Sequence, residues 1–300
     1  MSLPKVSIII ASFSSISHLT KCLKSLQPIA NNTEVIVSTI FSDTEVKELQ
    51  EPKVRFIYND EERYLDSIAL QETLVFRLRT KGIKEAKGEV IALIEDHCEA
   101  THNWTKTMQE ALKNKNCIAG GPVMNNATGG LYSWALYWSE YAAMMPPLPI
   151  NGLSYLSAVN SAYHKDALNG CKSVWKNGFY DNEVHDSLIE HGATYLPVKE
   201  ASVVTDLPFT FKRALVHLYT GGKRYGNYRG GSNWSIKRIL RLFATFLVPS
   251  VLLFRVYKLV RKRQPNLTFT LIKSSPILYL LLCSWGLGEF TGVLLNHNEK

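Results

Sequence analysis

The sequence lacks several features that would point to other kinds of protein. Its five cysteines are an odd number and form no Cys-x-x-Cys pair, so neither a zinc site of paired cysteines nor a disulfide framework is expected. Unpaired cysteines suit a reducing cytosol. The apolar run at 6–13 is only eight residues long and has no basic segment with a cleavage site around it. We therefore expect no signal peptide.

No glycine-rich loop follows that first apolar run, since residues 11–18 read ASFSSISH. A Gly-x-Gly-x-x-Gly turn at this place would indicate a nicotinamide-dependent dehydrogenase. A glycine-rich basic loop would instead indicate a nucleotidyltransferase that makes nucleotide sugars. Both classes are therefore disfavoured, although strands that alternate with helices would suit either.

Acidic residues are scarce in the last third of the chain. Residues 207–300 hold 15 Lys and Arg against two acidic residues, whereas residues 1–206 hold 19 against 24. A basic segment of this kind can bind nucleic acid or anionic lipid. The same segment contains long apolar runs, which favour lipid. We expect a membrane partner through residues 239–295 and no nucleic-acid partner.

Two apolar segments lie in this basic region. The first, 242–254, has 13 residues and contains Pro249, and the second, 276–295, has 20 residues and one acid, Glu289. A simple span needs about 20 residues. Basic residues also flank the first segment on both sides, which opposes crossing. We expect the first to lie on or dip into the cytoplasmic leaflet, and the second to cross or complete a re-entrant hairpin. A pair of soluble packing helices is the alternative.

Apolar runs alternate with helical patterns over the first 206 residues. This alternation predicts an α/β fold with a mainly parallel sheet and helices on both faces. In such sheets ligands bind at the carboxyl ends of the strands. The expected strands are 6–12, 34–40, 54–60, 89–94 and 117–123, and the expected helices include 16–27, 66–86 and 181–192.

Three polar residues, Glu95, Asp96 and His97, follow the buried run at 90–94. Carboxylate oxygen and imidazole nitrogen together suit Mn²⁺ or a similar divalent ion. On an extended backbone alternate side chains share a face, so Glu95 and His97 are expected to point together and Asp96 away. A cation there would hold a diphosphate and neutralise a leaving group. Taken alone, the tripeptide also fits a solvated loop.

Five segments in order resemble the family-2 inverting glycosyltransferases, which have the GT-A fold. They are VSIIIASFS (6–14), LRTKGIKEAKGEVIALIEDH (78–97), NSAYHKDAL (160–168), FYDNEVHDSLIEHG (179–192) and LPVKEASVVTD (196–206). We therefore expect a GT-A catalytic domain at 1–206, a basic linker or interfacial segment at 207–238 and membrane-associated helices at 239–300. The resemblance implies a membrane-associated, bacterial-type enzyme of cell-envelope polysaccharide synthesis, with its catalytic domain on the cytoplasmic face.

The same resemblance implies roles on the donor side. Residues 95–97 stand where the family has its Asp-x-Asp motif, so His97 is the expected ligand of Mn²⁺ or Mg²⁺, and Asp96 or Glu95 would complete the metal site or contact the donor ribose. Arg79 matches a basic residue near the diphosphate. A nucleotide-sugar donor would be bound by Ala11, Ser12, Phe13, Thr39, Arg79, Glu95 and Asp96. Thr39 departs from the family's usual Asp, which leaves the nucleobase open.

Asp181 matches the Asp of the family's Glu-Asp pair, with Tyr180 in place of the Glu. The resemblance makes Asp181 the base that takes the proton of the acceptor hydroxyl, with Glu183 in reserve. The acceptor would be a lipid or a lipid-linked glycan, held by Asn160, Ser161, Arg224 and Arg229. The segment 220–231 equally fits a basic, lipid-facing linker. The alternative function is a catalytically inactive nucleotide-sugar-binding protein on the same fold.

Overall fold

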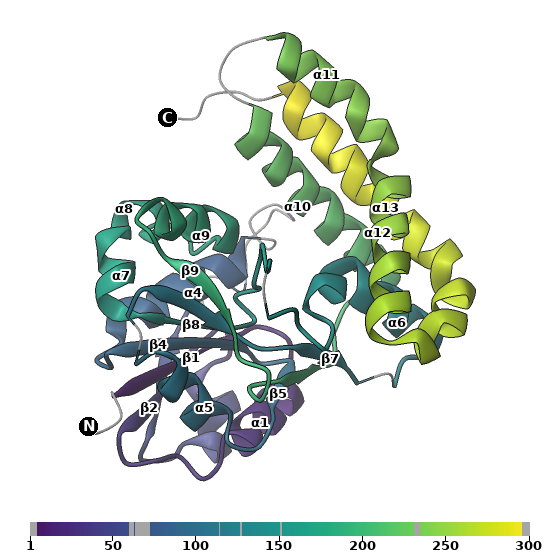
Figure 1. Ribbon diagram of the computed structural model, residues 1–300. Coiled ribbons are helices and arrows are strands. Elements are labelled where there is room, and N and C mark those ends of the chain that lie inside the picture. Colours follow the sequence, from purple (N-terminus) through teal and green to yellow (C-terminus); the bar gives the residue numbers. More distant parts are fainter. Residues whose placement is uncertain are drawn as a thin grey trace. The chain divides into compact units, whose positions relative to one another are not determined.

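A computed structural model describes most of the chain, and the chain divides into two compact units (Figure 1). The first unit is Met1–Asn126 with Met144–Asp206, and the second is Ala127–Ala143 with Leu207–Lys300. The segment 127–143 thus groups with the C-terminal residues, which nothing in the sequence pattern indicated. The described residues are 5–59, 63, 73–113, 115–126, 128–150, 152–230 and 235–295.

A seven-stranded sheet forms the centre of the first unit, in the order β3-β2-β1-β4-β8-β6-β9. Only β8 runs antiparallel to its neighbours, so the prediction of a mainly parallel α/β sheet is confirmed. The strands are β1 (Val6–Ser12), β2 (Thr33–Thr39), β3 (Val54–Tyr58), β4 (Val90–Glu95), β6 (Cys117–Gly120), β8 (Asn160–His164) and β9 (Thr194–Pro197). A smaller sheet joins β5 (Cys98–Ala100), β10 (Val203–Thr205) and β7 (Val123–Asn125).

Helices cover the large sheet, which explains why its central strands are continuous apolar runs. Every residue of β1 and β4 is buried, as expected for strands covered on both faces. Gly82 on α4 lies so close to β1 that a Cβ there would collide with the Ile9 side chain. The helices are α1 (Ile16–Ser25), α2 (Asp43–Val46), α4 (Leu74–Glu85), α5 (Trp104–Ala111), α7 (Lys165–Gly170), α8 (Lys172–Trp175) and α9 (Asp181–Glu190).

The strand order reverses between β1 and β4. From β1 the chain passes through α1 to β2 on one side, while β4 pairs with β1 on the other. The register places Ala11 beside Glu95, and the Asp96 amide donates to the Ala11 carbonyl over 3.2 Å. Open α/β sheets bind ligands at the carboxyl ends of strands at such a reversal. The Glu-Asp-His tripeptide lies at this point.

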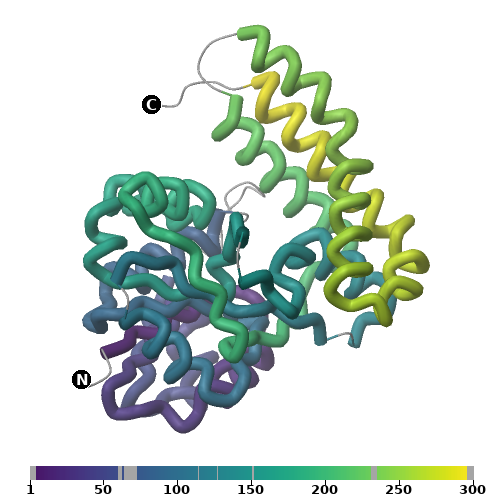
Figure 2. The backbone as a smooth tube through the Cα atoms, viewed as in Figure 1, coloured from purple at the N-terminus to yellow at the C-terminus, as the bar shows by residue number. Residues whose placement is uncertain are grey.

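The second unit is helical, and α10 packs along α13 within it (Figure 2). A Cβ added at Gly222 or Gly226 of α10, or at Gly288 or Gly292 of α13, would collide with the backbone of the other helix. Small residues at such a contact let two helix backbones approach closely. The predicted basic linker at 207–238 is thus largely a packed helix. The helices are α6 (Gly130–Tyr141), α10 (Phe211–Gly230), α11 (Ile236–Ala244), α12 (Val248–Arg263) and α13 (Thr268–Leu295).

The first apolar segment lies in a helix that is longer than the 13 apolar residues suggest. It lies in a helical run of 28 residues, Ile236–Arg263, and a second run of 31 residues covers Pro265–Leu295. Pro249 falls in the first turn of α12, where proline is tolerated because no intrahelical N–H bond is lost. By length and composition both runs could cross a membrane. The 13-residue length therefore no longer argues against a span.

Candidate active site

The Asp96 carboxylate holds the turn between β1 and α1. Its Oδ2 accepts from the backbone N–H groups of Phe13 and Ser14, over 2.8 and 2.7 Å, and from the Ser12 hydroxyl over 3.2 Å. Its Oδ1 accepts from the Ser14 hydroxyl over 2.7 Å. A buried carboxylate with four donors has its bonding capacity well used. The prediction that Asp96 binds a metal does not fit this geometry. Ser12 and Phe13 both donate to the Asp96 carboxylate, and these bonds stabilise the turn.

The His97 imidazole is buried, and among the described residues neither ring nitrogen forms a hydrogen bond of ordinary geometry. Burial lowers the pKa of the ring, but the neighbouring Cys98, Asp96 and Glu95 outweigh it and raise that pKa. The ring's Nδ1 lies 3.6 Å from Glu95 Oε2 and 3.8 Å from Asp96 Oδ1. The Phe13 ring meets it edge-on, with 6.3 Å between ring centroids. Buried polar groups almost always have partners. Two unbonded nitrogens beside a carboxylate oxygen therefore point to a ligand.

Arg79 on α4 forms a buried ion pair with Glu95 at the end of β4. Its guanidinium lies over the Phe76 ring, 5.6 Å from the centroid. Burial alone would lower the pKa of Arg79, but the carboxylates of Glu95 and Asp181 raise it. Its Nε and Nη1 have no hydrogen-bond partner among the described residues. Arg79 is thus a cation held in place by Glu95, and the N–H groups of its Nε and Nη1 bond no described residue.

Asp181 is the first residue of α9 and is half-buried. Its Oδ2 accepts from the Tyr155 hydroxyl over 2.8 Å and from the Ala158 N–H over 3.2 Å. Within the described part of the chain, Oδ1 accepts no hydrogen bond. Burial would raise the pKa of Asp181, but Arg79, His185 and the two donors together hold it below its usual value. Asp181 is therefore a carboxylate at neutral pH, with one oxygen open.

Three of these side chains contact one another in turn at the reversal of strand order, and Asp181 lies within electrostatic range of them. His97 approaches Glu95, Glu95 pairs with Arg79, and Arg79 and Asp181 act electrostatically on one another. Arg79 comes from α4 and Glu95 and His97 from the end of β4 and the turn after it, which are neighbours in the sequence, whereas Asp181 begins the distant α9. The group brings together a candidate cation ligand, a cation and an ionised carboxylate.

A buried series of hydrogen-bonded polar side chains lies near Asp181. The Ser161 hydroxyl and the Tyr163 hydroxyl are 2.7 Å apart, and the Tyr163 hydroxyl is 2.7 Å from Nε2 of His185. Burial lowers the pKa of His185 to about 4, so its ring is neutral at pH 7. Ser161 belongs to this internal series, which does not fit the predicted contact with an acceptor.

Asn160 also has an internal role. Its amide nitrogen donates to the carbonyls of Pro122 and Ala201, over 2.9 and 2.8 Å, and its amide oxygen accepts from the Trp104 indole over 2.8 Å. The amide thus holds three segments together and is 1 % exposed. The prediction that Asn160 binds the acceptor does not fit this geometry.

Other predicted residues lie apart from the group or use their side chains elsewhere. Thr39 is buried, and its hydroxyl accepts from the Phe41 N–H over 3.1 Å. Ala11 packs its methyl group in an apolar cluster with Leu74 and Leu78. Glu183 is half-buried on α9. The donor contacts of Thr39 and Ala11 and the reserve role of Glu183 stay predictions.

Arg224 and Arg229 belong to the second unit, on α10. The Arg229 guanidinium lies 5.2 Å from the centroid of the Tyr225 ring and donates to the Tyr225 hydroxyl over 3.1 Å. The acceptor role of both arginines stays a prediction.

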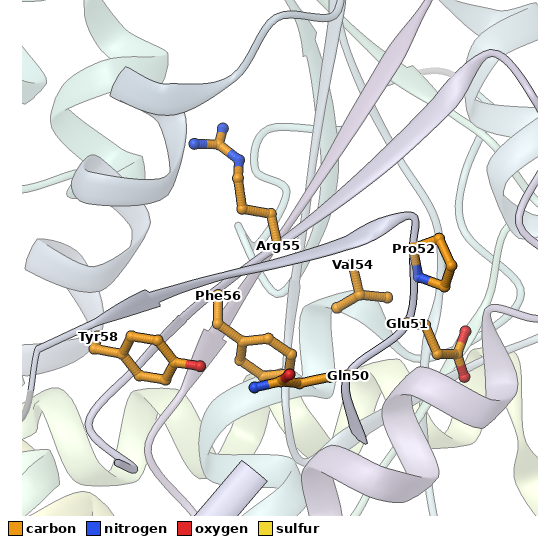
Figure 3. A pocket seen from close by; sticks show the side chains of 7 residues that line it. All are labelled: Gln50, Glu51, Pro52, Val54, Arg55, Phe56 and Tyr58. Atoms are coloured by element: carbon orange, nitrogen blue, oxygen red, sulfur yellow. The ribbon is translucent and has the colours of Figure 1, made fainter. Parts of the chain in front are cut away.

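A surface hollow of about 430 Å³ occupies the edge of the large sheet, away from this group (Figure 3). It is lined by Phe56 and Tyr58 of β3, whose rings stack with 6.1 Å between centroids, and Arg55 points to the opposite side of the strand. A second hollow lies between α1 and α2. Neither is lined by a predicted site residue.

Sequence reasoning missed Tyr155 and Ala158, which orient Asp181. Both lie in the irregular segment before β8, where the sequence has no pattern that would signal a contact with α9. A tyrosine hydroxyl or a backbone N–H that donates to a distant carboxylate has no recognisable motif in the local sequence. Only the fold brings them to the carboxylate.

Comparison with known proteins agrees with this class of fold, the GT-A fold of sugar-transferring enzymes. Residues 7–170 match the family described as "Glycosyl transferase family 2". This match covers more than half of the chain, and the chain belongs to that family.

The individual proteins to which the chain is similar share only a small part of its sequence. The chain is 27% identical over 159 residues to "Probable N-acetylgalactosaminyltransferase 9" of Caenorhabditis elegans, a match over 46% of this chain and 26% of that protein. The chain therefore spans about a quarter of that relative. A crystal structure of GalNAc-T7 with UDP, GalNAc and Mn²⁺ is similar with a TM-score of 0.47 and 15% identity, over 75% of this chain and 51% of the other.

Proposed function

We propose that the protein transfers a sugar, with inversion, from a nucleotide-diphospho-sugar to an acceptor held near a membrane, with the help of a divalent metal ion. The observation that carries this proposal is the contact of His97 with Glu95 and of Glu95 with Arg79 at the reversal of strand order, with Asp181 within electrostatic range of Arg79. Together these residues supply positive charge for a diphosphate and an ionised carboxylate for an acceptor within one region of the first unit.

The donor side of the site rests on buried groups that lack partners. The unbonded nitrogens of Arg79 suit oxygen atoms of a diphosphate, because guanidinium pairs well with phosphate. Placing these donors in a dry site makes each contact stronger than it would be in water. The pairing with Glu95 fixes the guanidinium in place before the donor arrives.

The residues present also fit a divalent ion. Although no group of three His, Cys, Asp and Glu side chains gathers in the described residues, His97 Nδ1 and Glu95 Oε2 lie 3.6 Å apart. These two atoms would hold Mn²⁺ or Mg²⁺, with the other positions left to diphosphate oxygens and water. When bound, the ion neutralises charge on the leaving nucleotide. Of the two expected partners of His97, Glu95 is thus the one we propose.

Asp181 acts on the acceptor side. Its open Oδ1 takes the proton of an acceptor hydroxyl while that oxygen forms its bond to the anomeric carbon. The bond from the anomeric carbon to the diphosphate breaks on the opposite face, and the nucleotide leaves with the bonding electrons. Attack opposite to the leaving group inverts the configuration. Because Tyr155 and Ala158 bind Oδ2, they leave Oδ1 to face the acceptor.

The acceptor is proposed as a lipid or lipid-linked glycan. The support is the basic second unit with its two long apolar helical runs, which would hold the enzyme where such an acceptor is found. On this proposal the catalytic unit faces the cytoplasm, where nucleotide sugars are made.

The test is a donor screen with the full chain. Purified protein is incubated with several nucleotide sugars, Mn²⁺ and a native lipid extract, and products are identified by mass. A new glycosylated product that disappears with Asp181→Asn supports the transferase. Tight donor binding without any transfer or hydrolysis would instead support the inactive binding protein.

A further inference from the structure

We propose that the second unit attaches the protein to one leaflet of an anionic phospholipid bilayer through one apolar face of α11–α13, which lies in the membrane plane and does not cross it. This inference concerns how the membrane is engaged and does not depend on the transfer reaction.

The face consists of two apolar stripes. Along α11, the 3-10 turn Thr245–Leu247 and α12, the exposed apolar residues follow helical spacing. They include Ile239, Phe243, Phe246 and Phe254, and the three phenylalanines are 60–69% exposed. Residues three, four and seven apart share one side of a helix. A second stripe on α13 runs from Phe269 through Ile272, Tyr279 and Leu280 to Leu287.

The two stripes adjoin one another. The rings of Phe246 and Phe290 are 5.4 Å apart between centroids, and the hydroxyls of Ser250 and Tyr279 are 3.5 Å apart. At about 100° per residue, the exposed stripe of α13 lies on the side opposite the residues that contact α10. The result is one continuous apolar face. Exposed patches of this kind mark interaction or membrane surfaces.

The contact with α10 argues against a transmembrane α13. From Ser284 to Val293, α13 lies against α10, where the Leu215 carbonyl accepts from the Ser284 hydroxyl and the Lys223 backbone abuts Gly288 and Gly292. If α13 crossed the bilayer here, α10 would enter the hydrocarbon with it. Ionised side chains are costly at that depth. Five lie along α10: Lys212, Arg213, Lys223, Arg224 and Arg229.

The rest of α13 is too short to cross alone. Before the contact with α10 it has about 16 residues, which is about 24 Å of helix against a hydrocarbon thickness of about 30 Å. The run 236–263 lies antiparallel to α13, and Phe246 meets Phe290 at the level of the α10 contact. A span by this run would therefore draw α10 into the bilayer too.

The turn between α12 and α13 argues against a re-entrant hairpin. Lys258, Arg261, Lys262 and Lys273 near it are exposed, and immersion would carry them into hydrocarbon. At the membrane surface each of these cations would be attracted to the anionic headgroups, and this attraction would strengthen membrane binding. Cations also lie over neighbouring aromatic rings, as with Lys273 over Phe269 at 4.3 Å and Lys258 over Phe254 at 5.4 Å. Such pairs suit an interface, where a ring faces lipid and a cation faces water.

The charge pattern indicates a lipid surface and not a protein as the occupant of the face. Between 239 and 295 the chain holds seven Lys and Arg and a single acid, Glu289. Uniform positive charge around a long apolar stripe is typical of helices that lie in the interface of anionic membranes.

Topology gives the decisive experiment. One cysteine at a time is introduced by Lys237→Cys, before the hairpin, by Asn266→Cys, at its turn, by Asn298→Cys, after α13, or by Glu190→Cys, in the first unit. Each change is made in the full chain with Cys283→Ser, and the other four cysteines are buried. A membrane-impermeant maleimide is applied to sealed, inside-out membrane vesicles. We expect all four positions to be labelled from the same side. Labelling of positions 237 and 266, or of positions 266 and 298, from opposite sides would overturn the proposal.

Vesicle binding tests the face and the lipid. The purified full chain should sediment with phosphatidylcholine vesicles that contain phosphatidylglycerol, and the pair Phe243→Ser and Phe246→Ser should weaken this at least about tenfold. Ile189→Ser, an exposed apolar residue of the first unit, is the matched control and should change nothing. The pair Lys258→Gln and Lys262→Gln should lose about fivefold per residue on anionic vesicles only. A stable dimer that ignores vesicles would overturn the proposal, since a second copy would then cover the face.

Discussion

The two units use buried arginine in opposite ways. In the second unit Arg238 is 3% exposed, and it donates to the carbonyls of Val293 and Leu294 over 2.9 and 3.3 Å, where α13 ends. In the first unit Arg79 is equally buried but bonds only Glu95 and keeps two nitrogens unbonded among the described residues. One arginine completes a helix terminus, while the other has capacity left for a ligand. Unused bonding capacity, more than charge or burial, thus distinguishes a binding residue from a packing residue.

The largest expected effect is on Asp181. Asp181→Asn should lower the transfer rate by about 10²–10⁴-fold while donor binding is retained, because the base is lost but the donor side is not. The measurement is initial rate by product mass, with donor affinity by calorimetry. Asp186→Asn, an exposed position on the same helix, is the control. Unchanged turnover in Asp181→Asn would remove this residue from the mechanism.

The comparison of the two arginines gives the second prediction. Arg79→Met should lower the free energy of unfolding by about 3–5 kcal/mol, because it leaves Glu95 buried without its partner. Arg238→Met should cost less, about 1.5–3 kcal/mol, since the carbonyls it leaves are neutral. Urea unfolding in mild detergent measures both. The contrast fails if Arg238→Met is the more damaging change.

His97→Ala tests the unbonded imidazole. We expect donor affinity in the presence of Mn²⁺ to fall by at least about tenfold, a loss of the size seen even for groups that only support a metal ligand. Affinity without Mn²⁺ should change little. His191→Ala, at an exposed histidine at the end of α9, is the matched control. Equal affinity of His97→Ala and the natural chain with Mn²⁺ would make His97 structural.

Tyr155→Phe should have the smallest effect, a shift in the pH profile. Asp181 works as a base only when ionised, so the rate falls as pH drops through its pKa. Removing the Tyr155 hydroxyl takes away a donor that stabilises the carboxylate, so the pKa rises and the acidic limb moves to higher pH. Tyr58→Phe is the control, because the Tyr58 hydroxyl also donates to a carboxylate, that of Asp43, away from this site. A profile identical to that of the natural chain would show that Tyr155 does not position the base.

The depressed pKa of Asp181 also has a consequence for stability. The ionised carboxylate stabilises the fold at pH values above the pKa it has in the unfolded chain, and this contribution is lost as pH falls through the lower pKa of the folded state. Asp181→Asn should therefore flatten the loss of stability at acidic pH, as measured by urea unfolding across that range.

Much of the first unit could be predicted from the sequence, because apolar runs such as 90–94 and 6–12 are long and buried on both faces. The expectation that Asp181, Arg79 and Glu95 belong to one site came from the family resemblance and not from local sequence patterns. The sequence could not show that Asp96 turns toward the opening loop or that Asn160 faces inward. Those outcomes depend on hydrogen bonds with residues 80 or more positions away for Asp96, and about 40 or more for Asn160.

The second unit was predicted less well for a physical reason. The first apolar run in its sequence has 13 residues, whereas the helix continues through flanking residues such as Lys258. A lysine is favourable in a helix but costly in the hydrocarbon of a bilayer, so hydropathy alone does not show where the helix ends. The sequence of 220–231 fits an acceptor-side loop or a basic linker, yet its Gly222 and Gly226 are where α10 meets α13. Whether a glycine loosens a chain or lets two helices touch depends on its partner, which the local sequence does not contain.

The central claim is that one site joins His97, Glu95, Arg79 and Asp181. It is tested most directly by a crystal of the full chain with Mn²⁺ and a nucleotide sugar, examined by anomalous scattering at the manganese edge. We expect a single manganese peak bonded to His97 and Glu95, with the diphosphate against Arg79 and the sugar between the metal and Asp181. A peak elsewhere, or a sugar bound away from Asp181, would contradict the account.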